Sequence, residues 1–441
     1  MRSIHLLLLL ALTATLTGLG QDLPTAKAVR QSGPVQIDGQ LNEAAWQNAP
    51  AHKGVLPLGK REPPQDTEFR LLFDDESLTI GITCWEKEMD KLEARTSIRD
   101  HGGVCSDDSV ELFLVPGNGY YYQIVVNTLG YVYDGRCFTD PELKQANFRN
   151  ALLWDNASEI AVWRGADRWS VEMRVFYASL DGFLGFSTPW RLNVCRTESR
   201  FGYACWAPVQ KGYHDLEHFG YLQGLELPQD RFTLDATKLK FPEILLGTNH
   251  LQLNLPAQRD GQKFRVLSSL RAWAPGPLPQ RSAHPGEFVS RDGQLTVEFE
   301  FNVRDYEPLQ ELVLECQDVQ SGAKVLLTTH LFRVPKPFAV TPRWTVFFGS
   351  EKEVLLDNTI RVSPLSARGT LRVEVFGASQ TVPQLQLNHA VEQPGPLLLG
   401  LPMSALGWDG CYRAVLTLDC DGGKAQFNQE VSFFKISAPL Y

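Results

Sequence analysis

The sequence lacks the short motifs that mark many metal, redox and nucleophile sites. Its eight cysteines include no CxxC or CxxCH pair and no zinc-type spacing. No GxSxG, SxxK or GxGxxG motif occurs in a suitable context. Acidic residues are plentiful, but glycoside hydrolysis needs two of them across a cleft, and no region is left over to form a catalytic barrel. We therefore expect a protein that is not an enzyme.

One local pattern imitates a metal site. The segment HDLEH, from His214 to His218, fits the HxxEH arrangement of inverted zinc proteases, whose two histidines share one face of a helix. Here Gly212 and Gly220 bracket the segment, which leads directly into the strand-like FGYLQ. Because no stable helix is expected at this place, the sequence argues against a zinc site.

Long apolar runs are scarce as well. The run from Ile4 to Leu12 follows Arg2 and precedes small residues that end at Gly20, which is typical of a secretory signal peptide. It is too short to span a bilayer. We expect a signal peptide over residues 1–20, cleavage near Gly20, a secreted or periplasmic protein and no membrane span.

The chain is acidic. Removal of the signal peptide with its Arg2 changes the formal charge from -9 to -10, and this negative charge argues against nucleic acid as a partner.

Helix signals are few, whereas short runs rich in Val, Leu, Phe, Tyr and Thr are common, and together they predict an all-β fold. Connector composition divides the chain into region one (26–230), region two (231–335) and region three (338–441). The spacing of strands in the last two regions predicts two smaller immunoglobulin-like β-sandwiches. In region one we expect strands at Phe69–Phe73, Leu78–Trp85, Ser109–Val115, Tyr121–Asn127, Glu159–Arg164, Trp169–Val175 and Arg191–Cys195.

The stretch from Asp107 to Asn127 reads DDSVELFLVPGNGYYYQIVVN and carries the best candidate for a binding site. Alternation places Glu111 on one face of its strand, opposite the apolar residues, and places Gln123 and Asn127 on one face of the next strand. An acid and two carboxamides close to aromatic residues are suited to hydrogen-bonding the hydroxyls of a sugar. The alternative is an ordinary half-buried sheet whose polar residues face solvent.

Two cysteines are placed so that they face each other. RLNVCR and YACW resemble the two arms of a hairpin that turns near Ser199 and Arg200, and Cys195 and Cys205 lie symmetrically about that turn. Export permits a disulfide between them. The alternative is a pair of small buried thiols.

Region one resembles carbohydrate-binding module family 9, within the DOMON-like β-sandwiches. The resemblance covers about 190 of the 441 residues and follows the order of the family's landmarks. Those landmarks are IDGQLNEAAW (Ile37 to Trp46), FRLLFDDESLTIGITCWE (Phe69 to Glu86), DDSVELFL (Asp107 to Leu114), YYQIVVNTLG (Tyr121 to Gly130), RWSVEMRVFYASL (Arg168 to Leu180), then WRLNVCR, CWAP and HFGYLQ.

The resemblance implies that a sugar ring stacks on Trp206 and that Glu111 bonds its hydroxyls, with Gln123 and Asn127 as further polar partners. A second stacking aromatic would fall near Cys105, where none is present. Stacking supplies much of the affinity for a pyranose, so this departure puts sugar binding in question unless another aromatic substitutes. The candidates for that role are Trp85 and Tyr122. The family is also known for structural calcium, for which the candidate ligands are Asp74, Asp75, Asp107 and Asp108.

The sequence therefore predicts an exported, non-catalytic carbohydrate-binding protein that acts in polysaccharide capture or carbohydrate catabolism. Its expected partner is a carbohydrate or polysaccharide, with protein partners for the two C-terminal sandwiches. One alternative is a structural or protein-interaction module on the same fold without sugar binding. A second alternative is an accessory part of a glycoside hydrolase system.

Overall fold

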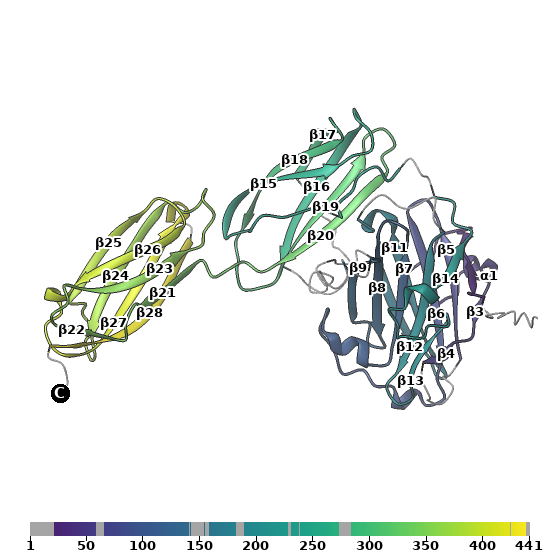
Figure 1. The fold of residues 1–441 in the computed structure, drawn as a ribbon, viewed down its shortest axis with the longest axis horizontal. Coiled ribbons are helices and arrows are strands. Elements are labelled where there is room, and N and C mark those ends of the chain that lie inside the picture. Colours follow the sequence, from purple (N-terminus) through teal and green to yellow (C-terminus); the bar gives the residue numbers. More distant parts are fainter. Residues whose placement is uncertain are drawn as a thin grey trace, which may run out of the picture.

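Three β-sandwiches follow one another along the chain and lie in a row (Figure 1). The computed structural model describes residues 22–58, 66–140, 142, 154, 158–181, 189–227, 231–237, 239–272, 284–423 and 425–437. The predicted signal peptide lies outside these residues. Within the described part of the chain, no helix is long and apolar enough to cross a membrane.

The first sandwich consists of two sheets. The larger sheet has the order β1 (Thr25–Lys27), β14 (Gly220–Gln223), β12 (Arg191–Glu198), β7 (Ser109–Val115), β8 (Tyr120–Asn127) and β9 (Val132–Phe138), and β13 (Gly202–Cys205) pairs with both β12 and β4 (Leu56–Leu58). The smaller sheet has the order β10 (Glu159–Arg164), β11 (Arg168–Phe176), β6 (Ser77–Trp85), β5 (Thr67–Phe73) and β2 (Val29–Arg30), and β3 (His52–Lys53) pairs with β5.

Alternation along the strands builds the core between these two sheets. On β7, Val110, Leu112 and Leu114 point into the core, and Ile80, Ile82 and Cys84 do so from β6. Since neighbouring residues of a strand point to opposite faces, the residues between them face outward from the sandwich. Each sheet therefore has one face in the core and one outer face on which a binding site can form.

The opening motif of region one is fastened to the smaller sheet by a buried carboxylate. Helix α1 (Ala44–Asn48) carries Trp46, whose indole Nε1 donates to Glu172 Oε1 at 2.9 Å. The other oxygen of Glu172 accepts the amides of Asp38 at 2.9 Å and Gly39 at 2.8 Å. Burial, the largest influence, raises the pKa of Glu172, and these hydrogen bonds oppose that shift. One side chain thus accepts hydrogen bonds from three donors of the opening motif.

The second and third sandwiches are smaller. In the second, β15 (Gly247–Pro256) pairs with β18 (Gln294–Val303), and the facing sheet has the order β17 (His284–Val289), β16 (Lys263–Ala272), β19 (Gln310–Asp318) and β20 (Lys324–Phe332). In the third, β21 (Phe338–Pro342), β23 (Glu353–Ile360) and β26 (Gly395–Pro402) face β22 (Val346–Phe348), β28 (Ala425–Ile436), β27 (Gly410–Cys420), β24 (Gly369–Gly377) and β25 (Leu385–Val391). Each has its own apolar core.

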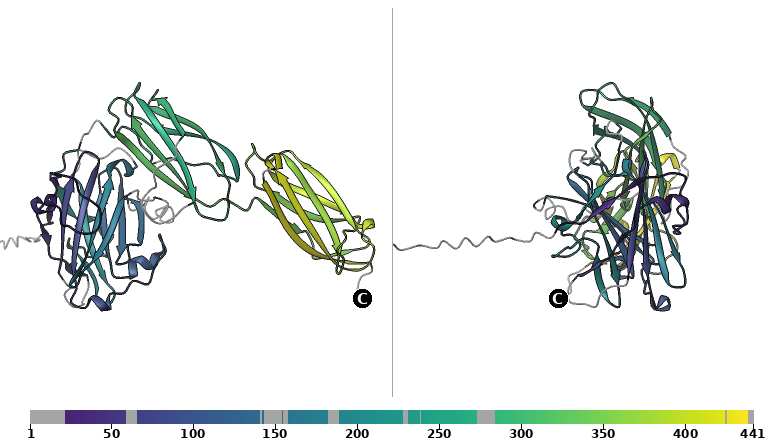
Figure 2. Two further views of the ribbon diagram at one scale, coloured as in Figure 1. Left: turned by 180° about the vertical axis from the view of Figure 1, so that it is seen from behind. Right: turned by 90° about the vertical axis from the view of Figure 1, so that its right-hand side faces the viewer.

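Direct contacts join neighbouring sandwiches. Val313 and Leu327 of the second sandwich extend the core cluster of the first. The amide of Ser363 donates to the carbonyl of Leu246 at 2.8 Å, and the amide of Thr248 donates to Ser366 Oγ at 3.0 Å, which links the second sandwich to the third. Seen from behind, the second sandwich separates the other two (Figure 2).

The predicted all-β class is confirmed. Every strand expected in region one is present, most of them extended by one to three residues, because hydrogen-bonded pairing continues beyond the run of β-favouring side chains. The helical elements of the described residues include α1 and short 3₁₀ turns, among them η2 (Gly102–Ser106), η4 (Tyr177–Ser179) and η5 (Leu216–His218).

Replacement of Glu172 tests the anchoring of the opening motif. Glu172→Gln points an amide at donors that need an acceptor, so we expect the free energy of unfolding to fall by about 2 to 4 kcal/mol. Urea unfolding followed by tryptophan fluorescence measures this loss, since seven of the ten tryptophans lie in region one. The control is Glu226→Gln, which changes an exposed carboxylate 4.0 Å from Arg30. Equal effects from both substitutions would contradict the anchoring role.

Candidate functional site

A cavity of about 330 Å³ opens on the outer face of the larger sheet of the first sandwich. Four tyrosines contribute most of its aromatic surface, and we name it the tyrosine cavity. Its lining consists of Cys105, Ser106, Glu111, Tyr121, Gln123, Tyr133, Gly135, Arg136, Cys137, Tyr203, Tyr213 and His214. Its volume is in the range of small-molecule sites.

Strand register places the polar floor of the tyrosine cavity. Glu111 lies between Val110 and Leu112 of β7, so its carboxyl points away from the core. Gln123 lies on β8 opposite Phe113, two positions along from Val125, which faces Glu111. Gln123 Nε2 donates to Glu111 Oε2 at 2.8 Å. The hydrogen-bonded pair therefore forms from two adjacent strands on one face of the sheet.

Glu111 is 3% exposed, and this burial shifts the balance between its protonated and ionised forms. Loss of hydration raises the pKa of Glu111 to about 7, and the hydrogen bond from Gln123 acts in the opposite direction. Near neutral pH the carboxyl is thus divided between its protonated and ionised forms. It can offer either a donor or an acceptor to a ligand hydroxyl.

The aromatic wall of the tyrosine cavity comes from a loop and a strand that are remote from β7 in sequence. Tyr203 on β13 and Tyr213 in the following loop make an edge-to-face contact with ring centroids 5.8 Å apart. Tyr213 Oη donates to the carbonyl of Arg196 at 2.8 Å, which fixes the loop to β12. Tyr203 is 48% exposed and forms the rim.

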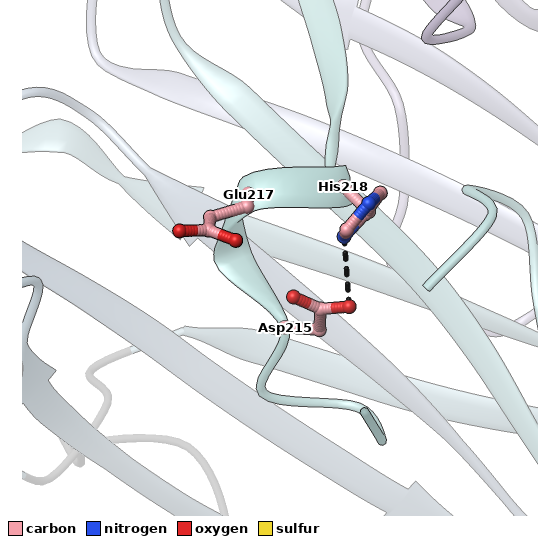
Figure 3. Close-up of side chains that lie close together, drawn as sticks. All are labelled: Asp215, Glu217 and His218. Atoms are coloured by element: carbon pink, nitrogen blue, oxygen red, sulfur yellow. Dashed lines mark hydrogen bonds and ion pairs between the residues drawn. The ribbon is translucent and has the colours of Figure 1, made fainter. Parts of the chain in front are cut away.

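The loop that carries Tyr213 and His214 is organised by Asp215. Asp215 Oδ2 accepts the amides of Gln210 at 2.8 Å and Lys211 at 3.2 Å, and lies 2.8 Å from His218 Nδ1 (Figure 3). Burial acts to raise the pKa of Asp215, but the two amides and His218 overcome it and lower that pKa. His214 Nδ1 lies 3.0 Å from Tyr121 Oη and closes the loop over β8.

Asp215, Glu217 and His218 are also the group of acids and histidines that lie close enough together, among the described residues, to suggest a metal (Figure 3). Asp215 already accepts three hydrogen bonds, and the exposed Glu217 pairs with Lys211 at 3.7 Å. The HDLEH pattern does not form the helix that a zinc protease needs, because His214 precedes the three-residue turn η5 and contacts Tyr121 instead.

The expected stacking residue Trp206 lies elsewhere. Cys205 faces outward on β13, so Trp206, the next residue, faces the core, where it is 7% exposed. Its ring packs edge-on against Phe69 with centroids 5.2 Å apart. Gly220 leaves the space for this ring, since a Cβ there would lie 2.3 Å from Trp206 Cζ3. In this structure Tyr213, seven residues later, supplies the aromatic surface that the sequence assigns to Trp206.

Three further predicted residues also lie outside the tyrosine cavity. Tyr122 faces the core, where its Oη donates to the carbonyl of Leu180 at 2.5 Å. Trp85 lines a different cavity, on the smaller sheet. Asn127 Nδ2 donates to the carbonyl of Thr96 and to Asp107, each at 2.9 Å, so its side chain holds a loop instead of facing a ligand.

The four aspartates suggested for calcium serve as acceptors of hydrogen bonds or ion pairs in this structure. Asp107 accepts the amides of Arg95 and Thr96, each at 3.0 Å. Asp108 accepts the amides of Glu93 at 2.5 Å and Ser199 at 3.1 Å. In addition, Asp74 accepts the amides of its own turn, and Asp75 pairs with Arg30 at 2.8 Å. Calcium remains a prediction, which thermal unfolding with and without EDTA tests.

Cys195 and Cys205 face each other across β12 and β13, as the hairpin argument anticipates. They are directly paired in register, and their Sγ atoms are 3.2 Å apart as two thiols. Both belong to a small apolar cluster on the outer face of the sheet, against which Tyr213 packs. The disulfide itself remains a prediction.

Sequence reasoning missed the aromatic residues of the tyrosine cavity, namely Tyr121, Tyr133, Tyr203, Tyr213 and His214. Tyr121 was within reach, because it is two residues from Gln123 and therefore shares its face. Tyr133 of β9 lies opposite Val125 of β8, and Val125 lies opposite Glu111 of β7. Only the pairing of β8 with β9 reveals this position of Tyr133. The positions of Tyr213 and His214 depend on the folding of a loop, which no periodicity indicates.

Comparison with known proteins yields matches in structure. No protein-family model matches the sequence, and no curated protein matches it either. The similar solved structures include a proposed carbohydrate-binding protein from Bacteroides uniformis ATCC 8492, at 14% identity over 46% of this chain and 100% of that chain, with a TM-score of 0.36.

Two other similar structures match different shares of this chain. A carbohydrate-binding module of family 9 from Caldicellulosiruptor kristjanssonii, in complex with glucose, has 16% identity over 45% of this chain and 97% of its own, with a TM-score of 0.32. An Escherichia coli alpha-2-macroglobulin has 9% identity over 89% of this chain and 32% of its own, with a TM-score of 0.22. At these values the function has to be inferred from the cavity itself.

The raised pKa of Glu111 makes stability depend on pH. The carboxyl titrates near 4.5 when solvated and near 7 when folded, so its contribution is full below pH 4.5 and is lost as pH rises through 7. We expect Glu111→Gln to gain on the order of 3 kcal/mol in free energy of unfolding relative to the native chain between pH 4 and pH 8. Urea unfolding at several pH values measures this difference. The control is Glu217→Gln, which changes an exposed carboxylate. If the free energies of unfolding of Glu111→Gln and of the native chain vary with pH in parallel, the shifted pKa of Glu111 is refuted.

Oxidation of the protein is expected to link Cys195 to Cys205. The cross-link would close a loop of about ten residues and stabilise region one by up to about 3 kcal/mol. Peptide mapping by mass spectrometry without reduction identifies the linked peptides, and reductant should lower the midpoint of thermal unfolding. Cys195→Ala serves as the control, since its unfolding should not respond to reductant. Two free thiols after air oxidation would contradict the prediction.

Proposed function

We propose that the tyrosine cavity binds a sugar unit of a carbohydrate or polysaccharide without cleaving it. The observation that carries the proposal is the hydrogen bond between the buried Glu111 and the half-buried Gln123 at the floor of a cavity walled by tyrosines. A pyranose has apolar C–H faces and hydroxyl edges, and it needs aromatic surface beside polar groups. The cavity offers both within one sheet.

The arrangement of polar groups supports hydroxyl recognition in particular. Glu111 has one oxygen engaged by Gln123, which leaves the other directed to the cavity side of the sheet. Gln123 retains its carbonyl oxygen as an acceptor. Arg136 lines the cavity, but its guanidinium pairs with Asp181 at 2.5 Å, so it does not bring an unpaired charge. A neutral sugar therefore suits the site better than an anionic one.

The single carboxylate supports binding rather than hydrolysis. Glycosidases use two carboxyl groups on either side of the scissile bond. Within the described lining of the tyrosine cavity, Glu111 is the one acidic residue. We infer a recognition module in an exported protein, whose second and third sandwiches act as spacers or contact surfaces.

Substitutions at Tyr213 test the proposal. A glycan array first identifies a ligand for the chain from residue 21 onward, and titration then gives its affinity. We expect Tyr213→Ala to bind at least tenfold more weakly, because the ring supplies stacking worth about 1 kcal/mol or more beyond its buried area. Tyr213→Phe keeps the ring and should keep most of the affinity.

The control for this test is Tyr221→Ala, which removes a tyrosine of β14 that lies outside the cavity lining. Circular dichroism spectra establish that each variant remains folded. The proposal fails if Tyr213→Ala binds as tightly as the native chain, or if no glycan binds at all. In the second case a protein-interaction role for the same fold becomes the better account.

A further inference from the structure

A second cavity, of about 380 Å³, lies on the outer face of the smaller sheet. Its lining includes the buried Trp46 and two more accessible tryptophans, Trp85 and Trp163, and we name it the tryptophan cavity. The tryptophan cavity and the tyrosine cavity share no lining residue. Their sheets enclose the common core from opposite sides, so the two cavities open on opposite faces of the first sandwich.

Register brings the tryptophans together. On β6, Ile82 and Cys84 point into the core, which turns Thr83 and Trp85 outward. Trp163 of β10 lies opposite Ser170, and Ser170 lies opposite Thr83. The two indoles therefore flank a floor of small hydroxyl residues on three adjacent strands, and both are half-buried.

The wall of the tryptophan cavity is held before any ligand arrives. It comes from α1 and the loop before it, which the buried Glu172 binds through the indole of Trp46 and the amides of Asp38 and Gly39. Leu41 of this loop lies directly on the sheet above Gly81, where a Cβ would come within 2.4 Å of Leu41 Cδ2. Binding would therefore not require the wall to become ordered, a cost that often limits affinity.

The polar groups of this wall are carboxamides. Gln40, Asn42 and Gln47 line the cavity, and their side chains make no hydrogen bond to any other described residue. A carboxamide provides both a donor and an acceptor, which matches the two roles of a sugar hydroxyl. The wall thus presents open hydrogen-bonding capacity next to aromatic surface.

The cations around the tryptophan cavity are paired with acids, and Glu68 pairs with two of them. Glu68 lies 3.3 Å from Lys53 and 3.5 Å from Arg70. Arg168 pairs with Asp167 at 3.1 Å, and its guanidinium lies 5.8 Å from the centre of the Trp163 ring. Because each of these cations already has an acidic partner, a ligand does not need a negative charge to bind in this cavity.

We propose that the tryptophan cavity is a second glycan-binding site, which takes a neutral sugar unit between Trp85 and Trp163 independently of the tyrosine cavity. A single sandwich with sites on opposite faces can hold two glycan chains, or two parts of one chain. Attachment at both sites to one polysaccharide raises the overall affinity without any new contact, through effective concentration.

The test is fluorine NMR of the mature chain labelled with 5-fluorotryptophan, which observes each indole directly. Trp85→Phe and Trp163→Phe assign the two resonances. The probes are cellohexaose, xylohexaose, mannohexaose and maltohexaose. We expect at least one of them to shift both resonances saturably, in the native chain and in Tyr213→Ala alike, while the resonance of the exposed Trp344 in the third sandwich stays in place.

Each outcome has a defined meaning. The inference is overturned if neither resonance moves with any probe, or if both shifts disappear in Tyr213→Ala, since the tryptophan cavity would then not bind on its own. Trp85→Ala should weaken the saturating shift of Trp163 at least tenfold. A third outcome is that the resonances of Trp85 and Trp163 shift while Tyr213→Ala leaves the affinity for the glycan unchanged. This outcome would support the tryptophan cavity as a sugar site and reject sugar binding in the tyrosine cavity.

Discussion

The strict alternation of side chains along β7 and β8 is the constraint on which the first sandwich depends. It sends Val110 and Leu112 into the core and turns Glu111 to the outer face, where it meets Gln123. A shift of one residue in the register would bury the carboxyl between the sheets and expose the apolar set. The same sequence rule that stabilises the core therefore also creates the site.

The site costs stability to maintain. A carboxyl that is 3% exposed loses hydration, and one hydrogen bond from Gln123 does not restore its usual pKa. Asp215 illustrates the opposite case, since backbone amides and His218 keep it charged while it shapes the loop that carries Tyr213. The structure therefore leaves the carboxyl of Glu111 poorly compensated for its burial and the carboxylate of Asp215 well satisfied. This contrast agrees with the proposal that Glu111 binds a ligand and that Asp215 supports the loop beside it.

The organisation of the chain extends this picture. Apolar contacts and backbone hydrogen bonds join consecutive sandwiches, so the first is presented at one end of an elongated molecule (Figure 1). The tyrosine cavity and the tryptophan cavity occupy opposite faces of that end. Protein partners of the second and third sandwiches remain a prediction, and so does export, because both concern what the chain meets and not how it folds.

The sequence by itself determined the all-β class and the strands of region one. It also determined the outward position of Glu111 and Gln123, because a period of two is local and each strand carries it in its own residues. It also placed Cys195 opposite Cys205, since a hairpin fixes register through its turn.

Only the tertiary structure decided which aromatic residues surround the polar pair. Trp206 stands in a strand-like segment, but the residue before it faces outward, and packing against Phe69 draws its ring into the core. Tyr213 reaches the site because Asp215 accepts hydrogen bonds from the amides of its loop, and because the backbone carbonyl of Arg196 accepts a hydrogen bond from the hydroxyl of Tyr213. Trp85 and Trp163 meet only when β10, β11 and β6 pair. These positions depend on contacts between residues far apart in the chain, which local pattern cannot encode.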